Sequence, residues 1–287
     1  MTIARVGVVG CGLMGGGIAQ VVAQAGFPTT VVEADQAFLD RGLGQVRRSL
    51  DGLVERGRLA APERDTVWGR LRGSLRLENL GEADFVIEAV TENVALKKDT
   101  FARLDRICPP HAVLANNTSS CTVTELAAAT KRPAQVVGLH FFNPAPIMKL
   151  VEVVRTILTS DATVKTAWDF VQNLGKTPVA AQDTTGFIVN RLLVPYLLEA
   201  IRLLESGVAS KEDIDQAMKL GCGYPMGPFT LLDLVGLDTT LFVAEVMFQE
   251  FREARLAPPP LLRRMVLAGH LGRKSGKGFY DYSSGGR

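Results

Sequence analysis

Apolar residues in the first half of the chain alternate between short β-branched runs and stretches with helical spacing. This alternation is typical of parallel strands joined by crossover helices. The β-branched runs predict strands at residues 4–9, 29–33, 85–89, 113–116, 136–142 and 149–154. Helical spacing predicts helices at residues 13–25, 37–72, 94–107, 125–130 and 161–174. We therefore expect a doubly wound α/β domain.

The second half of the chain has a different pattern, because the β-branched runs stop after Gln182. Helices are predicted at residues 188–205, 211–220, 229–255 and 261–268. The chain is thus expected to form an α/β domain at residues 1–182 and an all-α domain at residues 183–287. Nothing at the junction resembles a long flexible linker.

Composition limits the classes of protein that fit. The 287 residues are 47% hydrophobic, which is enough for two cores. A net charge of +2 gives no general attraction to nucleic acid or to an anionic membrane. The four cysteines lack CxxC spacing, so we expect no metal site and a reducing compartment. The chain enters its first strand without a signal or transit segment, and its most apolar stretch, residues 187–204, carries charged residues; a cytoplasmic protein is expected.

A glycine-rich loop lies between the first predicted strand and the first predicted helix. Gly10, Gly12 and Gly15 form G-x-G-x-x-G, with Leu13 and Met14 inside the pattern. The glycines permit a tight turn, close approach of a pyrophosphate and close packing of helix on strand. The free N–H groups of the helix start favour an anion. The loop therefore predicts a Rossmann-like dinucleotide site.

The second predicted strand ends in two acidic residues, at the position where such domains bind the adenosine ribose. Asp35 is the preferred acceptor of the ribose hydroxyls, and Glu33 is the alternative. A carboxylate there repels a ribose 2′-phosphate, and no arginine follows immediately, so NAD is favoured over NADP. The alternative interpretation is that both acids are solvated residues of a loop without a binding role.

His140 is the best candidate for a catalytic base among the three histidines. It closes an apolar strand at the carboxyl end of the sheet, where α/β domains build active sites. Oxidation of an alcohol needs a base near neutrality, which suits imidazole. His111 lies in a predicted surface turn after two prolines, and His270 lies beside Gly269 in the C-terminal segment; surface or capping roles are assigned to both. A lone histidine at a strand end is more often structural, so a partner is needed.

Glu152 is the candidate partner of His140. Residues 143–148 contain two prolines and must turn the chain, so the strand at 149–154 can return beside the histidine. A buried, unpaired carboxylate is costly, which favours a hydrogen-bonded partner. The glutamate would then hold one imidazole tautomer and stabilise the imidazolium. Spacing alone leaves this pairing open.

The chain resembles the L-3-hydroxyacyl-CoA dehydrogenase family, including bacterial 3-hydroxybutyryl-CoA dehydrogenases, over nearly its whole length. The resemblance lies in VGVVGCGLMGGGIAQ, VVEADQ, EAVTEN, NNTSS, GLHFFNPAPIMKLVEVV, DTTGFIVNRLLVPYLLEA, GCGYPMGPFTLLDLVGLD and GRKSGKGFYDY. It implies that His140 is the general base and that Glu152 orients it. The implied reaction is interconversion of an L-3-hydroxyacyl-CoA, such as 3-hydroxybutyryl-CoA, and a 3-ketoacyl-CoA with NAD.

The resemblance also implies further contacts. Ser119 and Asn190 would donate hydrogen bonds near the substrate oxygen, since neutral donors stabilise negative charge without taking the proton. By spacing alone, Ser119 or equally Ser120 is a helix N-cap, and Asn190 is a helix-start residue. Additional cofactor contacts are implied for Glu92, Lys97, Asn143 and Lys274. Contacts to coenzyme A are implied for Ser49 and Arg56, in a helical region shorter than in animal members.

Two other functions stay open at this point. One is a dehydrogenase of another 3-hydroxy acid, such as a sugar acid, on the same fold. The other is a non-catalytic nucleotide-binding protein, although all four implied catalytic residues are present. The motif SSCTVTEL and the Arg-rich helical stretch favour an acyl-CoA thioester as the partner. The resemblance and the apolar residues at 229–248 also predict a homodimer formed through the second domain.

Overall fold

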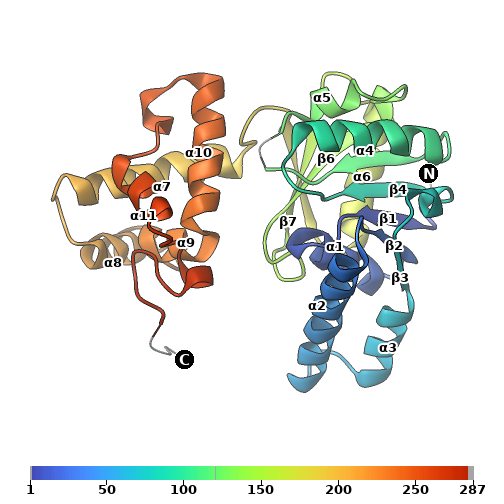
Figure 1. Ribbon diagram of the computed structural model, residues 1–287, viewed down its shortest axis with the longest axis horizontal. Coiled ribbons are helices and arrows are strands. Elements are labelled where there is room, and N and C mark those ends of the chain that lie inside the picture. The colour runs from blue at the N-terminus through green and yellow to red at the C-terminus, as the bar shows by residue number, and fades with distance from the viewer. Residues whose placement is uncertain (1, 120, 284–287) are drawn as a thin grey trace. The chain divides into compact units, whose positions relative to one another are not determined.

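The computed structural model describes residues 2–119 and 121–283, so that Ser120 lies outside the described residues (Figure 1). The chain divides into two compact units, Met1–Thr184 and Thr185–Arg287. None of the described helices is long and apolar enough to span a membrane.

The first unit is built on one sheet with strand order β3-β2-β1-β4-β5-β6-β7-β8. Its strands are β1 (Val6–Val9), β2 (Thr29–Val32), β3 (Leu71–Ser74), β4 (Phe85–Glu88), β5 (Val113–Asn116), β6 (Val136–Phe141), β7 (Leu150–Arg155) and β8 (Thr177–Gln182). Strands β1 to β6 are parallel, β7 is antiparallel to β6, and β8 is parallel to β7. The order runs outward from β1 in both directions, which confirms the doubly wound α/β prediction.

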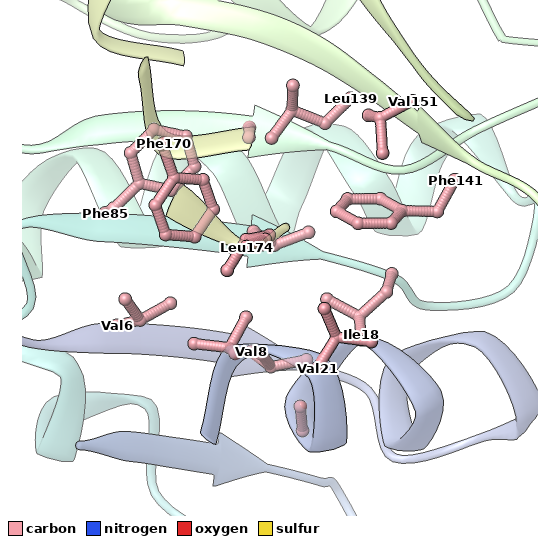
Figure 2. Close-up of a cluster of buried hydrophobic side chains, with 14 of the residues drawn as sticks. Val6, Val8, Ile18, Val21, Phe85, Leu139, Phe141, Val151, Phe170 and Leu174 are labelled. Atoms are coloured by element: carbon pink, nitrogen blue, oxygen red, sulfur yellow. The ribbon is translucent and has the colours of Figure 1, made fainter. Parts of the chain in front are cut away.

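Helices cover both faces of this sheet. They are α1 (Leu13–Gln24), α2 (Gln36–Glu55), α3 (Ala61–Gly69), α4 (Val94–Ile107), α5 (Val123–Ala127) and α6 (Asp161–Asn173), with single turns η1 (Leu77–Leu80) and η2 (Pro133–Gln135). Helices α1 and α6 bury their apolar sides in one core, where the rings of Phe85 and Phe170 stack 4.3 Å apart (Figure 2). Strand β6 gives this core Leu139 and Phe141, so that His140 between them faces the other side. Helix α5 lies on that other side, because its Val123 is the neighbour of Gly138.

The predicted single helix over residues 37–72 is wrong. Helix α2 ends at Glu55, Gly57 adopts a left-handed φ of +66°, and α3 starts anew with Pro62 in its first turn. Residues 71–74 form β3, an edge strand. Helical spacing continued across the break because both helices pack on the same side, whereas the strand has no apolar run to reveal it. Strand β8, at the other edge, was missed for the same reason.

The second unit is helical, as predicted. Its helices are α7 (Val189–Glu205), α8 (Lys211–Cys222), α9 (Pro228–Val235), α10 (Leu237–Phe251) and α11 (Pro260–Leu267), with single turns η3 (Ala254–Leu256) and η4 (Arg273–Ser275). The helix expected over residues 229–255 is instead two helices, because Gly236 has a φ of +102° and breaks the repeat. These helices share one apolar core that includes Phe229 and Met247.

Buried carboxylates attach the C-terminal segment to this unit. Asp233 accepts hydrogen bonds from Phe279 N and Tyr280 N, each at 2.8 Å, and from Tyr282 Oη at 3.1 Å. A side chain at Gly278 would collide with the Asp233 carboxylate. The conspicuous motif GRKSGKGFYDY is thus explained largely by packing against α9.

The boundary between the units lies after Thr184, whereas the sequence pattern placed it after Gln182. Asp183 accepts hydrogen bonds from Val123 N at 3.0 Å and from Thr124 N and Oγ1, both at 2.6 Å. Its carboxylate therefore caps the start of α5, and Asp183 belongs with the first unit. A change in hydrophobic pattern could not reveal this contact.

Burial predicts the reactivity of the four cysteines. It raises the pKa values of the Cys11, Cys108 and Cys121 thiols to about 11, while Cys222 is exposed. Because the thiolate is the nucleophile, a maleimide at about pH 8 should modify only Cys222 in the native protein. Mass spectrometry should show one label in the native chain, none in Cys222→Ser, and labelling of all thiols after denaturation. Fast labelling of Cys11 in the native protein would contradict the burial of its thiol.

Candidate active site

The glycine loop follows β1 and has the geometry of a phosphate-binding turn. Gly10 has a φ of +94°, which favours glycine. A side chain at Gly15 would collide with the Gly10 carbonyl oxygen, so this glycine lets α1 pack closely on the strand. Gly12, in contrast, has no heavy atom within 4 Å of the position that a Cβ would take. Two glycines are thus required by packing, and the middle one leaves space.

The start of α1 can bind an anion. Its N-cap is Gly12, which provides no side-chain hydrogen bond to the free N–H groups of the first turn. A cavity of about 560 Å³ lies over this loop. Its lining includes Gly12, Leu13, Glu33, Phe38, Arg41 and Leu96. An uncapped helix start, an open glycine and an acidic residue in one cavity fit a dinucleotide.

Glu33, and not Asp35, is the acidic residue of this cavity. Asp35 is the N-cap of α2, where Oδ1 accepts hydrogen bonds from Ala37 N at 2.8 Å and Phe38 N at 3.3 Å. Glu33 directly follows β2, and its Oε2 accepts a hydrogen bond from Cys11 N at 2.8 Å. Both acids accept backbone hydrogen bonds, but only Glu33 lines the cavity, so Asp35 as the acceptor of the ribose hydroxyls stays a prediction and Glu33 is the alternative that the geometry favours.

His140 and Glu152 lie directly opposite each other in the antiparallel pair β6–β7. His140 Nδ1 lies 2.6 Å from Glu152 Oε2. His140 is 4% exposed and Glu152 is fully buried, so both belong to the interior of the first unit. The other ring nitrogen, Nε2, lies 3.0 Å from Ser119 Oγ. His111, by contrast, pairs with Asp84 at the amino ends of β4 and β5, away from this site.

Ser119 lies in the loop after β5 and is held there by Glu92. The Glu92 carboxylate accepts hydrogen bonds from Ser119 N at 3.0 Å, from Thr118 Oγ1 at 2.8 Å and from Cys121 Sγ at 3.3 Å. A continuous set of contacts therefore runs from Glu92 through Ser119 and His140 to Glu152. The structure brings these four predicted residues together.

Lys97 is fully buried and is engaged by other side chains. Its Nζ lies 3.0 Å and 3.2 Å from the two carboxylate oxygens of Glu88 and 3.6 Å from Glu92 Oε2. Glu88 ends β4 and also accepts hydrogen bonds from Val90 N and from the side chain of Asn116. Burial raises the pKa of Glu88, and the Lys97 ammonium opposes that rise. Lys97 thus pairs with both Glu88 and Glu92 and helps to hold the Glu92 carboxylate in place.

The remaining predicted residues are more scattered. Asn143 is exposed in the turn between β6 and β7. Asn190, in the first turn of α7, and Lys274, whose Nζ lies 2.7 Å from Asp238 Oδ2, belong to the second unit. Ser49 lies on α2 and Arg56 is its C-cap, both beyond the part of the helix that lines the cavity. Arg56 is about 16 Å along the helix from Gln45, at 1.5 Å per residue.

Three positioning residues were missed by the sequence patterns. Glu88 carries the same signal as Glu152, a carboxylate in an apolar strand, and could have been found by it. Asn117 Oδ1 accepts a hydrogen bond from Phe141 N at 3.0 Å and ties the loop after β5 to the end of β6. Lys176 gives no signal in the sequence, because its acceptors are backbone carbonyls. Among the described residues, no His, Cys, Asp and Glu cluster has the arrangement of a metal site.

A dinucleotide cavity and a buried His–Glu pair on one doubly wound sheet define a Rossmann-fold dehydrogenase. The chain belongs to the 3-hydroxyacyl-CoA dehydrogenase family. Residues 5–184 match the family model for the NAD binding domain, and residues 186–282 match the model for the C-terminal domain. The resemblance noted in the sequence is confirmed.

Relatives cover the whole chain. A 3-hydroxybutyryl-CoA dehydrogenase of Mycobacterium tuberculosis is 51% identical over 98% of this chain and 99% of its own. Among solved structures, M. tuberculosis FadB2 has a TM-score of 0.97 at 50% identity, covering 98% of this chain and 100% of that one. The (S)-3-hydroxybutyryl-CoA dehydrogenase of Ralstonia eutropha has a TM-score of 0.94 at 43% identity, covering 99% and 100%.

Two neighbouring variants test which acid belongs to the cofactor cavity. Glu33→Ala should weaken NADH binding by about tenfold or more, because it removes a charged hydrogen-bond acceptor. Asp35→Ala should leave NADH affinity unchanged and cost about 1 kcal/mol of stability through loss of the N-cap. Fluorescence titration with NADH and thermal unfolding measure the two effects. The reverse pattern would restore Asp35 as the acceptor.

Proposed function

We propose that this protein interconverts an L-3-hydroxyacyl-CoA, with a short acyl chain such as 3-hydroxybutyryl, and the corresponding 3-ketoacyl-CoA. The observation that carries the proposal is the 2.6 Å contact between His140 Nδ1 and Glu152 Oε2, with Nε2 directed at Ser119 Oγ, in an NAD-binding domain of this family. The names of the full-length relatives support the substrate.

His140 acts as the general base through Nε2. Glu152 engages Nδ1, so the neutral imidazole keeps its proton on Nδ1 and presents the lone pair of Nε2. As the substrate hydroxyl loses its proton to Nε2, the buried carboxylate stabilises the imidazolium. Bound NAD would supply the acceptor for the hydride that leaves the carbinol carbon. In the reverse direction, the imidazolium returns the proton to the ketone oxygen.

Ser119 and Asn190 orient the reacting oxygen in this proposal. Ser119 Oγ is 3.0 Å from His140 Nε2, so a substrate oxygen that contacts both groups would lie beside the imidazole that takes its proton. The Asn190 amide is the second donor, from the second domain. Neutral donors stabilise the developing negative charge without competing for the proton. Glu92 acts through Ser119, whose backbone N–H it holds.

The cofactor and the thioester use largely different residues, and Ser119 is proposed to contact both. Gly10, Gly12 and Gly15 hold the pyrophosphate, with Leu13 and Met14 at the helix start, and Glu33 binds the adenosine ribose. Further NAD contacts are proposed for Glu92, Asn143 and Lys274, with Lys97 acting behind Glu92. The Glu33 carboxylate disfavours the 2′-phosphate of NADP. Ser49 and Arg56 on α2 are proposed to contact the coenzyme A moiety, where Arg56 is exposed and can reach a phosphate.

The second domain is proposed to contribute to substrate binding through Asn190 and to form a homodimer, and the protein is proposed to act in the cytoplasm. Its described helices leave large apolar side chains in solvent, including Leu220, Leu234 and Phe242, at 75%, 48% and 42% exposure. Exposed apolar residues on neighbouring helices are typical of a subunit interface. The bacterial relatives support a cytoplasmic location.

His140→Gln tests the proposed chemistry. The variant should bind NADH normally but lose about 100- to 10,000-fold in kcat with acetoacetyl-CoA, because a general base contributes that much. Retention of more than about a tenth of wild-type turnover would refute the base assignment. Wild-type kinetics across 3-ketoacyl-CoA chain lengths, with NADH and NADPH, define the substrate. Saturation by free sugar acids, with indifference to coenzyme A esters, would point to another 3-hydroxy acid.

The homodimer has its own test. Multi-angle light scattering at micromolar concentration should give twice the chain mass of 31.0 kDa. Leu234→Asp together with Phe242→Asp should shift the protein towards the monomer, because each places a charge on the proposed apolar interface. A wild-type monomer under these conditions would refute the dimer.

A further inference from the structure

Lys176 is a buried lysine that binds only backbone carbonyls. It is 9% exposed, and its Nζ donates hydrogen bonds to Ala145 O and Met148 O, both at 2.7 Å. Within the residues that the structure describes, no carboxylate forms an ion pair with it. Burial lowers the pKa of Lys176. Burying an ammonium without a counter-charge costs free energy, and the two hydrogen bonds to backbone carbonyls offset part of that cost.

Both acceptors belong to the turn that connects β6 with β7. Within this turn, Ile147 N and Met148 N each donate to Pro144 O at 3.0 Å. Lys176 adds a second set of contacts from outside, one to Ala145 and one to Met148. The turn therefore has its backbone held at two points by a single charged group.

The other side of the turn packs on the glycine-loop helix. A Cβ at Gly17 of α1 would lie 3.2 Å from Ala145 Cβ and 3.3 Å from Pro146 Cδ. Ala145 is 2% exposed. The turn thus contacts both α1 and Lys176, and a shift of the turn would disturb both sets of contacts.

The register of β6 against β7 decides whether the His–Glu pair exists. His140 faces Glu152 across this antiparallel pair, and a slip of one residue would move Glu152 to the opposite face of the sheet. Turn geometry sets the register of such a hairpin. Strand β8 begins directly after Lys176, with Thr177 N donating to Lys149 O at 2.8 Å. The Lys176 contacts with the turn and the pairing of β8 with β7 therefore lie at adjacent positions in the chain.

We propose that Lys176 is a positioning residue for the reaction: its ammonium clamps the turn that sets His140 opposite Glu152 and seats this turn on the glycine-loop helix. The inference rests on the proposed function of His140 and Glu152. Lys176 acts through the backbone and touches neither of these side chains. Among the described residues, the imidazole is contacted by Glu152 at Nδ1, by Ser119 at Nε2 and by the Phe142 ring, with Glu92 bonded to Ser119 N.

The test compares Lys176→Met with Lys165→Met, a matched change at an exposed lysine paired with Asp169 on α6. Lys176→Met should lower kcat by about 10- to 100-fold, the size of effect expected when a catalytic group is misplaced by about 1 Å. The KM for acetoacetyl-CoA should stay unchanged. The alkaline limb of the kcat/KM pH profile for this reduction should move to lower pH, because the imidazolium is the acid in this direction and a displaced Glu152 stabilises it less. Lys165→Met should match the wild type in all three.

Folding is checked by circular dichroism and NADH binding. If Lys176→Met does not fold, Lys176→Gln replaces it, because its amide can still donate to one carbonyl and should give the same kcat and pH effects in smaller measure. A folded variant with wild-type kcat and pH profile overturns the proposal. Failure of both variants to fold also overturns it, since Lys176 would then serve stability alone. His140→Gln, run in parallel, tests the base itself: full activity there sinks the proposed function whatever the lysine variants do.

Discussion

The antiparallel pairing of β6 with β7 is the constraint on which the active site depends. Alternation along both strands places Leu139, Phe141 and Val151 in the core shared by α1 and α6, and this burial fixes the face on which the residues between them must lie (Figure 2). His140 and Glu152 are those residues, and the pairing register makes them direct neighbours. The apolar core therefore also fixes the polar pair, because a register slip of one residue would move Glu152 to the opposite face of the sheet, away from His140.

The unit that holds this pair buries several charged side chains, and each of them has a partner. Glu88, Lys97, Glu152 and Lys176 are all nearly or fully inaccessible, and each has partners in hydrogen bonds or ion pairs. Isolated burial of any of them would be strongly unfavourable, so their partners are as necessary as they are themselves. Glu88 ends β4, Ser119 follows β5 and His140 nearly ends β6. The polar network thus lies along the carboxyl ends of neighbouring parallel strands, where a doubly wound sheet binds its ligands.

Local patterns predicted most of the fold and part of the site. The helix at Val94–Ile107 was predicted with the bounds that the structure has, since Asn93 caps its start and its apolar spacing is regular. The break at Gly57 was missed, because two successive helices on one side of the sheet keep a similar spacing. The pattern could not decide between Glu33 and Asp35 as the acid of the cofactor site, because both follow β2 closely and only the structure shows that Asp35 caps α2 and that Glu33 lines the cavity.

The sequence by itself determined the α/β alternation, the helical second half, the glycine loop and His140 as the base candidate, because each is a short-range pattern or a rare residue at a strand end. The family resemblance added Ser119, Glu92 and Lys97 without explaining them. Only the tertiary structure decided that Asp35 caps a helix, that Glu88 neutralises Lys97 and that Lys176 holds the turn between β6 and β7. The Lys176 contacts join residues distant in the chain and use backbone atoms that every residue carries, and the two shorter-range contacts depend on where a strand ends and a helix begins, so the side-chain pattern alone does not encode them.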